Sequence, residues 1–355
     1  MSKFLSDLYS ALEPYTPGEQ PKDKAYIKLN TNESPFPPSP KVKEAISGEV
    51  IDDLNLYPDP EVVMLRDALA ENFGVKRENI FVGNGSDDVI AFSVMAFCGR
   101  GGKLACPDIT YGFYPVYAEL FGVNLTEVPL MEDFSVKVED YKDFNCPVII
   151  ANPNAPTGLM LTLNEVEELV NQNPDRLVIM DEAYMDFGKA SAVELTKKYN
   201  NLMVIQTFSK SRSLAGLRVG FAVANTEIIR DLETMRFSFN PYNINSLTMR
   251  AATAAIKDKA YYDGCIDKII DNREQTKTEL VKMGFKVLDS KSNFIFASHP
   301  DYSAKSLYEE LKNRGILVRY FSKERIKDFV RITVGSKEQM QSVVNEISNI
   351  LKGLI

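Results

Sequence analysis

The sequence is poor in the residues that most often bind metals or form cross-links. It has one histidine, four cysteines and no tryptophan among 355 residues. The cysteines are scattered and form no C-x-x-C pair, so we expect reduced thiols, no metal site and a cytoplasmic location. No G-x-S-x-G motif accompanies the single histidine, His299, which argues against a Ser-His-Asp hydrolase.

Long hydrophobic runs and basic clusters are also absent. No run approaches the roughly 18 consecutive apolar residues of a membrane span. Residues 1–14 lack the apolar core of a signal peptide. Aspartate and glutamate total 49 against 41 lysines and arginines, which gives a net charge of −8. Neither a nucleic acid nor a membrane is therefore an expected partner.

What the sequence does contain is typical of a large globular α/β protein. Apolar residues make up 45% of it and charged residues 25%, and the length suggests about two domains. Helical patterns fall between short runs rich in Val and Ile; one such helix opens at Ser86, and another opens with a capping box of Thr162 and Glu165. This alternation predicts mostly parallel strands with helices on both faces. The runs expected to be strands are 79–82, 103–106, 147–151, 177–180, 202–205 and 217–224.

The pattern changes after about Arg236. One long helical region is expected at 245–283, with Gly284 as its stop, followed by a helix at 303–314 and a last helix that Ser336 caps. The strands expected between these helices are 285–289, 293–297, 316–321 and 329–334. We therefore expect three regions: an arm and the start of a small domain at 1–48, a large domain at 49–245, and a small α+β domain at 246–355.

The strongest chemical signal is the string TFSKSRSLAGLRVG at 207–220. Lys210 follows the end of a buried strand, and Arg218 lies eight positions later. A lysine that is desolvated and close to other cations can be neutral enough to form a Schiff base. The hydroxyl groups of Thr207 and Ser209, together with the guanidinium, are suited to hold a phosphate. A Ser-Lys pair alone would more often lie in a surface loop, so the signal depends on the whole string.

Within this string, S-K-x-x-x-L-A-G-x-R-x-G resembles the lysine motif of fold-type-I aminotransferases that use pyridoxal 5′-phosphate. The resemblance covers nearly the whole chain. It implies an α/β fold with a large domain, built on a mostly parallel central sheet flanked by helices, and a smaller α+β domain. It also implies that Lys210 binds the cofactor and moves the substrate proton, while Thr207, Ser209 and Arg218 hold the cofactor phosphate.

Two further motifs of the same family supply residues for the cofactor ring. The resemblance implies that Asp181, in VIMDEAY at 178–184, keeps the ring nitrogen protonated. It implies that Tyr184 hydrogen-bonds the 3-oxygen of the ring and that Tyr111, in PDITYGFY at 107–114, stacks on the ring. Alone, Asp181 would more often be a strand-end aspartate that caps a helix, and Tyr111 could be an aromatic ring of the core or of a dimer contact.

Two more motifs lie near expected strand ends. The turn GNGSD at 83–87 opens a helix, and Gly85, Ser86 and Asp87 match the family's phosphate loop. A dinucleotide-binding turn would need a third glycine, which is missing. In NPNAPTG at 152–158, Ala155 stands where the family usually has an asparagine that contacts the 3-oxygen, so Asn154 is the expected donor.

The N-terminal motifs are similar to those of histidinol-phosphate aminotransferases. The strings at 12–18 and 29–40 match L-x-P-Y-x-P-G and L-N-x-N-E-x-P-x-P-P-S-P, so the proline-rich run at 34–40 is expected to be an arm over the active site instead of a linker. NLYPD at 55–59 resembles R-Y-P-D, with Leu56 in place of the arginine. The resemblance implies a homodimer in which Tyr57 reaches the cofactor phosphate of the neighbouring subunit.

The same resemblance suggests where substrates bind. Tyr15 and Asn32 of the arm are expected substrate contacts, together with Arg319 and Arg331 near the C-terminus. A planar guanidinium binds a carboxylate or phosphate through two hydrogen bonds. Two arginines could therefore accept both the phosphate of histidinol phosphate and the carboxylates of glutamate.

The expected activity is transfer of an amino group between L-histidinol phosphate and 2-oxoglutarate in histidine biosynthesis, with pyridoxal 5′-phosphate as cofactor and small molecules as substrates. Two alternatives within the family are an aromatic amino-acid aminotransferase and a threonine-phosphate decarboxylase. A cofactor-binding regulator would need a DNA-binding segment, and only about 25 residues precede the arm motif at 29–40. A nicotinamide oxidoreductase is disfavoured by the missing third glycine.

Overall fold

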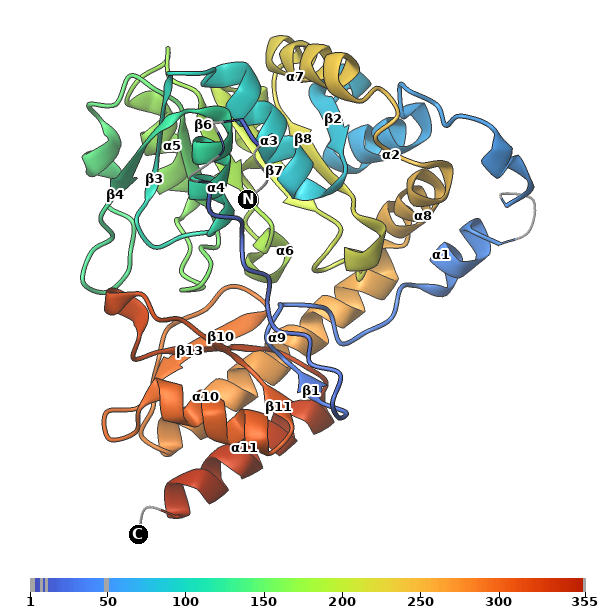
Figure 1. The fold of residues 1–355 in the computed structure, drawn as a ribbon. Coiled ribbons are helices and arrows are strands. Elements are labelled where there is room, and N and C mark those ends of the chain that lie inside the picture. Colours follow the sequence, from blue (N-terminus) through green and yellow to red (C-terminus); the bar gives the residue numbers. More distant parts are fainter. Residues whose placement is uncertain (1–3, 7–8, 10–11, 48–50, 354–355) are drawn as a thin grey trace.

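The computed structural model describes residues 4–6, 9, 12–47 and 51–353, which form two layered parts (Figure 1). The part at the top of the figure is built on a large sheet and the part below it on a smaller antiparallel sheet, with helix α9 (Lys259–Lys282) reaching from one to the other. The N-terminal segment passes between the two parts and adds β1 (Ile27–Lys28) to the lower one. The α/β fold class is confirmed, whereas the domain boundaries stay a prediction.

The large sheet has the strand order β2-β8-β7-β6-β5-β3-β4. Every neighbouring pair in it is parallel except the two pairs that β8 makes, so a mostly parallel sheet is confirmed. The strands are β2 (Ile80–Gly83), β3 (Lys103–Pro107), β4 (Asn124–Val128), β5 (Val148–Ala151), β6 (Val178–Asp181), β7 (Leu202–Thr207) and β8 (Gly220–Val223).

Two strands differ from the sequence-based expectation. β8 is antiparallel to both neighbours because its connection to β7 contains only the 3-10 helix Ala215–Leu217, and no α-helix carries the chain back across the sheet. This reversal brings Arg218, just before β8, to the edge where β6 and β7 end. β4 is an edge strand with mostly exposed or half-buried residues, so no buried apolar run marks it in the sequence.

Helices cover both faces of the large sheet. Along β5, Val148 and Ile150 pack into one hydrophobic cluster, whereas Ile149 and Ala151 pack into another, as expected for a strand buried on both faces. The first cluster includes residues of α2 (Val63–Phe73), α5 (Leu163–Asn171) and α8 (Ser246–Lys257). The second includes residues of α3 (Gly85–Phe97), α4 (Phe113–Phe121) and α7 (Thr226–Phe239). The remaining helices of the upper part are α1 (Pro40–Ala45) and α6 (Met185–Gly188).

The smaller sheet has the order β12-β13-β10-β9 and is antiparallel throughout. A parallel pair of β1 and β11 lies beside it, and α9, α10 and α11 pack on this part through a hydrophobic cluster that also includes Ala155, Tyr184 and Phe187 of the upper part. The elements are β9 (Lys286–Val287), β10 (Phe294–Ser298), α10 (Ala304–Asn313), β11 (Ile316–Leu317), β12 (Arg319–Tyr320), β13 (Val330–Thr333) and α11 (Lys337–Lys352).

The single helical region expected at 245–283 is in fact two helices, α8 and α9. The break falls at Asp258, whose backbone has φ −99° and ψ 50° and whose carboxylate pairs with Lys41 of α1 at 2.9 Å. Gly284 follows the end of α9 with φ 91°, as its role as a stop requires. The capping boxes expected to open α5 and α11 both form. No helix in the described part of the chain combines the length and apolar character that a membrane span needs.

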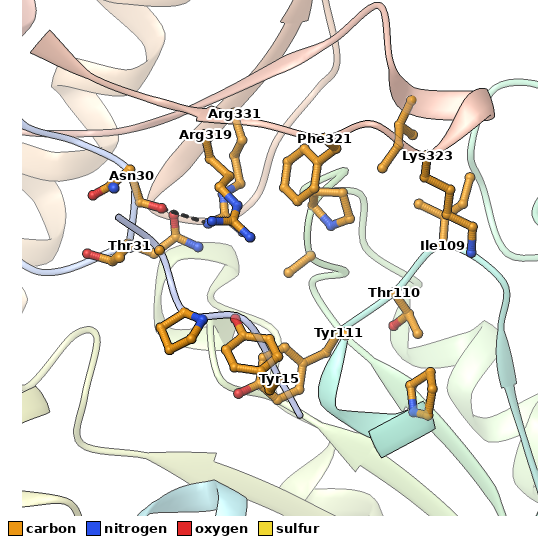
Figure 2. A pocket seen from close by; sticks show the side chains of 18 of the residues that line it. Tyr15, Asn30, Thr31, Ile109, Thr110, Tyr111, Arg319, Phe321, Lys323 and Arg331 are labelled. Atoms are coloured by element: carbon orange, nitrogen blue, oxygen red, sulfur yellow. Dashed lines mark hydrogen bonds between the residues drawn. The ribbon is translucent and has the colours of Figure 1, made fainter. Parts of the chain in front are cut away.

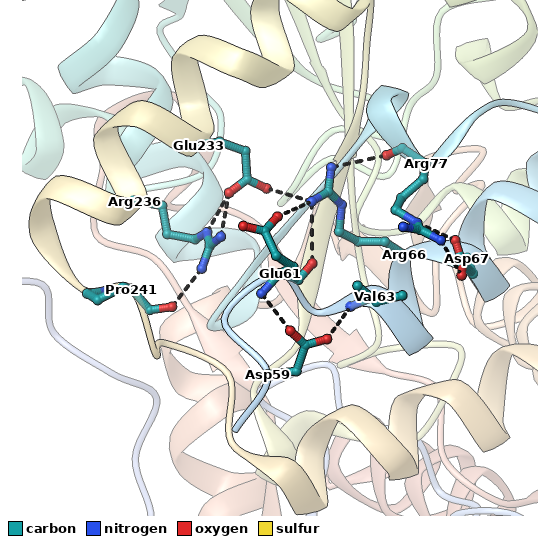
Figure 3. Close-up of polar contacts among 9 residues, drawn as sticks. All are labelled: Asp59, Glu61, Val63, Arg66, Asp67, Arg77, Glu233, Arg236 and Pro241. Atoms are coloured by element: carbon teal, nitrogen blue, oxygen red, sulfur yellow. Dashed lines mark hydrogen bonds and ion pairs between the residues drawn. The ribbon is translucent and has the colours of Figure 1, made fainter. Parts of the chain in front are cut away.

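A buried charge network ties α2 to the end of α7 (Figure 3). Glu233 of α7 accepts a hydrogen bond from Arg236 at 2.8 Å and forms an ion pair with Arg66 of α2 at 3.5 Å. Arg236 is 1% exposed and also donates to the Pro241 carbonyl at 2.8 Å. Burial raises the pKa of Glu233 even though two guanidinium groups lie beside it. The network fixes the segment that leaves α7 against the start of α2.

Candidate active site

Several strands end at one edge of the large sheet and bring the expected site residues together there. β6 ends at Asp181 and β7 at Thr207, while β8 begins just after Arg218. Gly220 at the start of β8 pairs with both Thr207 and Gly83, so the antiparallel strand begins level with the ends of its neighbours. In mostly parallel sheets this edge is the usual place for a ligand.

Two cavities at this edge share wall residues and form one site. The Asp181 cavity has a volume of about 200 Å³ and the Arg331 cavity about 450 Å³. The residues that line both are Thr31, Tyr111, Ala155, Tyr184 and Lys210. Most residues expected to bind a cofactor line the Asp181 cavity: Ser86, Asp87, Tyr111, Asp181, Tyr184, Thr207, Ser209, Lys210 and Arg218. All four residues expected to bind substrate line the Arg331 cavity: Tyr15, Asn32, Arg319 and Arg331.

One end of the Asp181 cavity carries groups suited to an anion. Ser86 lies in the first turn of α3, where backbone N–H groups are free to bind a ligand. The hydroxyl groups of Thr207 and Ser209 are 3.0 Å apart, and the Arg218 guanidinium lies 3.4 Å from Ser209 Oγ. Hydroxyls, a guanidinium and a helix N-terminus together form a donor set that fits a phosphate.

Asp87 faces this end as well, but its carboxylate is already engaged. It accepts one hydrogen bond from Arg218 Nη2 and one from the Tyr111 hydroxyl, both at 2.8 Å. Burial raises the pKa of Tyr111, and the nearby Asp87 carboxylate raises it further by a smaller amount. This phenol therefore stays protonated as the donor. The Asp87 side chain therefore positions Arg218 and Tyr111, and only its backbone could contribute to an anion site.

Two glycines permit the close approach of α3 to β8. A Cβ atom at Gly220 would lie 2.2 Å from the backbone nitrogen of Ser86. Gly85 has φ 83°, and a Cβ atom there would lie 2.4 Å from Arg218 Nη2. Both positions therefore need glycine to hold the helix N-terminus and Arg218 at the same anion site.

The other functional group of this cavity is the buried Asp181 carboxylate. Asp181 is 4% exposed; its Oδ2 accepts a hydrogen bond from the Tyr114 hydroxyl at 2.7 Å, and its Oδ1 accepts one from the Ala183 backbone at 3.2 Å. Burial raises the pKa of Asp181 to about 6, although these hydrogen bonds favour the ionised form. Sequence reasoning did not select Tyr114, which lies three positions after Tyr111 in the same motif.

Lys210 lies where the two cavities meet. Its Nζ donates to the Thr31 carbonyl at 3.4 Å and lies 5.7 Å from the centre of the Tyr184 ring. The Tyr184 hydroxyl accepts a hydrogen bond from Asn32 Nδ2 at 2.9 Å, which leaves its own hydrogen available for a ligand. Asn32 Oδ1 accepts from the Thr333 hydroxyl at 3.0 Å. Asn32 thus positions Tyr184, and its expected contact with substrate stays a prediction.

The Arg331 cavity contains two arginines that face each other across adjacent strands (Figure 2). Arg319 of β12 is the direct antiparallel partner of Arg331 of β13. Like charges in directly opposite positions destabilise a sheet, and among the residues that the structure describes neither arginine forms an ion pair with a carboxylate. Arg331 donates to the Asn30 carbonyl at 3.1 Å, and burial lowers the pKa of its guanidinium. This uncompensated pair favours an anionic ligand.

The N-terminal segment covers part of the same cavity. Tyr15 stacks on Phe113 of α4 with ring centres 4.3 Å apart, and Figure 2 shows it close to Tyr111 at the cavity wall. Four residues further on, Glu19 is bound by Tyr308 and Lys312 of α10. The segment is therefore fastened to both parts of the molecule.

Besides Gly85, two residues expected to bind the cofactor lie outside both cavities of this chain. The Asn154 amide group donates to the Ile109 carbonyl at 2.9 Å and to the Thr157 hydroxyl at 3.1 Å, and its side chain faces a different, smaller cavity. Tyr57 is 82% exposed and stacks on Tyr242. The proposed roles of both residues stay predictions. In the described residues, no cluster of His, Cys, Asp or Glu could hold a metal ion.

Comparisons with known proteins assign the chain to a family. The family model "Aminotransferase class I and II" matches residues 24–347. The histidinol-phosphate aminotransferase of Brachyspira hyodysenteriae is 54% identical over 353 residues, which cover 99% of this chain and 100% of that protein. The histidinol-phosphate aminotransferase of Clostridium botulinum strain 657 is 47% identical over 354 residues, which cover both proteins completely.

A solved structure agrees with the fold. The histidinol-phosphate aminotransferase from Sinorhizobium meliloti, determined in complex with pyridoxal-5′-phosphate, superimposes with a TM-score of 0.91 at 24% identity, covering 100% of this chain and 99% of that one. At this identity the likeness concerns the fold alone. The family match, which spans most of the chain, and the two close relatives decide the assignment. The chain belongs to the class I and II aminotransferase family.

Proposed function

We propose that this protein is a histidinol-phosphate transaminase that depends on pyridoxal 5′-phosphate. It transfers an amino group between L-histidinol phosphate and 2-oxoglutarate, giving imidazole-acetol phosphate and glutamate in histidine biosynthesis. The observation that carries the proposal is the pair of opposed arginines, Arg319 and Arg331, in the cavity that also contains Lys210. Relatives that carry this name at 54% and 47% identity over nearly the whole chain support it.

The residues of the Asp181 cavity fit the cofactor. A phosphate matches the anion site at Ser86, Ser209 and Arg218, and a protonated ring nitrogen matches the buried carboxylate of Asp181. Tyr111 and Tyr184 line the same cavity and are suited to the ring face and its 3-oxygen. When bound there, pyridoxal phosphate supplies an electron sink for the charge left on the substrate Cα after its proton departs.

The chain's own residues then have separate tasks. We propose that Lys210 Nζ would hold the cofactor and, as general base and acid, would move the proton of the substrate Cα. Above about pH 6 Asp181 is ionised, and it accepts the hydrogen bond from Tyr114. Tyr184 donates its free hydroxyl hydrogen toward the ring oxygen while Asn32 fixes its position.

The Arg331 cavity holds the rest of the substrate in this proposal. Arg319 and Arg331 bind the phosphate of histidinol phosphate in one half of the reaction and a carboxylate of 2-oxoglutarate in the other. Tyr15 adds a hydroxyl contact from the N-terminal segment. Because the enzyme would carry the amino group covalently between the two halves of the reaction, the proposal implies ping-pong kinetics.

We also propose that two copies of the chain form a homodimer that shares its active sites. Tyr57 stacks on Tyr242 with ring centres 4.7 Å apart, yet both rings are exposed. Other large apolar side chains from the same two chain segments are exposed as well: Ile51, Leu54, Leu56, Phe237 and Phe239. Exposed apolar groups gathered from two segments are typical of a protein interface.

A cytoplasmic location also stays a prediction.

Contacts drawn in Figure 3 fix the turn that follows Tyr57. Asp59 accepts hydrogen bonds from the backbone nitrogens of Glu61 and Val63, both at 2.9 Å, and so holds the turn after Tyr57. Val62 within this turn has φ 51°, a strained conformation for a β-branched residue that only well-fixed surroundings maintain. We propose that this turn presents Tyr57 to the cofactor phosphate of the second copy.

Cofactor binding is expected to depend on pH through Asp181. Burial raises the pKa of this carboxyl to about 6, so below that pH the protein must lose a proton before it can pair with a cationic ring. Cofactor affinity should therefore rise as pH increases through about 6, and Asp181→Asn should lack this component. Dissociation constants measured between about pH 5 and pH 8 for both proteins test this. An identical pH dependence in the variant would contradict the assigned role.

Substrate choice is expected to depend on both arginines. Loss of a buried bidentate contact to a dianion should cost about 2–4 kcal/mol, or roughly 30- to 1000-fold in kcat/KM. Arg331→Lys keeps the positive charge but loses the planar guanidinium that can donate two parallel hydrogen bonds. It should therefore lower kcat/KM for histidinol phosphate more than for phenylalanine. Arg314→Lys, which alters an exposed ion pair with Glu346, is the matched control.

In the wild type, the kcat/KM for histidinol phosphate divided by that for phenylalanine decides between related activities. We expect it to exceed one. A ratio below one would replace the proposal with an aromatic amino-acid aminotransferase. Release of carbon dioxide from threonine phosphate, without amino transfer to 2-oxoglutarate, would replace it with a decarboxylase.

The shared site is expected to allow complementation. Tyr57→Ala and Lys210→Ala chains should each have little activity, but a mixed dimer contains one site with both wild-type residues. Mixing the two proteins should therefore restore activity. The control mixes Tyr57→Ala chains with chains that carry both substitutions, which can form no complete site. If mixed dimers form and activity does not recover above this control, the shared site is wrong.

A further inference from the structure

The loop at 208–214 carries Lys210 and is called the lysine loop below. It has a carboxylate partner that the proposed reaction does not use. Asp186 lies in α6, two residues after Tyr184, and its Oδ2 accepts a hydrogen bond from the hydroxyl of Ser211. Arg212 approaches the same oxygen at 3.5 Å. The two residues that follow Lys210 are thus both bound by one carboxylate from another element.

The surroundings make this contact more than a surface ion pair. Ser211 is 4% exposed, so its hydroxyl would lose a buried hydrogen bond without Asp186. The Arg212 side chain is 14% exposed and lies over the ring of Tyr262 of α9, with 5.9 Å from its guanidinium carbon to the ring centre. Asp186 therefore connects a fixed guanidinium and a buried hydroxyl on the same loop.

The rest of the loop is closed around Lys210. The Leu214 backbone nitrogen donates to the Phe208 carbonyl at 3.0 Å. Ser213 has φ 56° and donates from its hydroxyl to Ser34 at 2.9 Å. A non-glycine residue in this conformation needs support from its neighbours. The loop is thus anchored at Leu214, at Ser213 and, nearest to Lys210, at Ser211 and Arg212.

We propose that Asp186 is a positioning residue for Lys210. Through Ser211 and Arg212 it fixes the backbone that aims Lys210 Nζ at the junction of the two cavities. Because Asp186 follows Tyr184 in the same turn, it also fixes the spacing between the lysine and the tyrosine expected to face the cofactor ring. This inference rests on the proposed function, since it concerns the lysine that attaches the cofactor.

The charged and titratable groups around Asp186 and Lys210 come from several elements. They are Arg212, Tyr262, Glu182, Glu33, Asp181 and Tyr184. Removing the Asp186 charge leaves Arg212 without its ion pair next to the loop that carries Lys210. The added net positive charge disfavours the cationic form of a cofactor bound on this loop.

The test compares holoenzymes of the wild type, Asp186→Asn and Ser211→Ala. Asp267→Asn is the matched control, because it removes an exposed ion pair with Lys189 at the other end of α6. Displacement of a catalytic group by a fraction of an ångström should lower kcat by about 10- to 100-fold with little change in KM. The midpoint of the pH-dependent colour change of the lysine-bound cofactor should also move to lower pH in Asp186→Asn, which a loss of stability alone would not cause.

Ser211→Ala removes only the hydroxyl and tests the same contact if Asp186→Asn does not fold. The double variant should lower kcat by less than the product of the two single fold-changes, because both substitutions act through one contact. If kcat and the spectral midpoint of Asp186→Asn equal those of Asp267→Asn, the positioning role is wrong. If borohydride does not fix the cofactor to Lys210 in the wild type, the proposed function itself is wrong.

Discussion

The site depends on buried or half-buried charges that have no partner of opposite charge in contact. Asp181 is a carboxylate 4% exposed whose close partners are a phenol and a backbone amide. Arg319 and Arg331 are cations placed directly opposite each other. Burying such groups is unfavourable unless a ligand completes them. The rest of the architecture, from the sheet edge to the N-terminal segment, holds these charges on either side of Lys210.

Sheet topology is what makes this arrangement possible. The ends of β6 and β7 supply Asp181 and Thr207, and the reversed strand β8 returns Arg218 to the same edge. Glycine at position 220 then lets the N-terminus of α3 approach within van der Waals contact of β8. The cation Arg218 and the buried anion Asp181 thus line one cavity, which suits a cofactor with a phosphate and a ring nitrogen.

Much of this was predictable because strong local patterns encode it. Buried apolar runs marked most strands, and the string around Lys210 identified the lysine together with Arg218. Features set by tertiary contacts were not predictable. Asp258, where the helix breaks, pairs with Lys41 from a distant part of the sequence, and Tyr114 becomes important only because α4 packs beside the end of β6.

Sequence reasoning was least informative where function depends on register or on the orientation of a side chain. That Arg319 and Arg331 are direct cross-strand partners follows from the pairing of β12 with β13, which no motif specifies. The contact between Asp186 and Ser211 joins elements far apart in the sequence. Asn154 was chosen from its position beside Ala155, yet its amide faces Ile109 and Thr157.

The central claim is that Lys210, at the junction of the two cavities, carries the cofactor. The most direct test is to reduce the purified holoenzyme with borohydride, digest it and locate the pyridoxyl group by mass spectrometry. We expect a single labelled peptide that contains Lys210, and no label in the Lys210→Ala protein. Label on another lysine, such as the exposed Lys189, with Lys210 unmodified would contradict it.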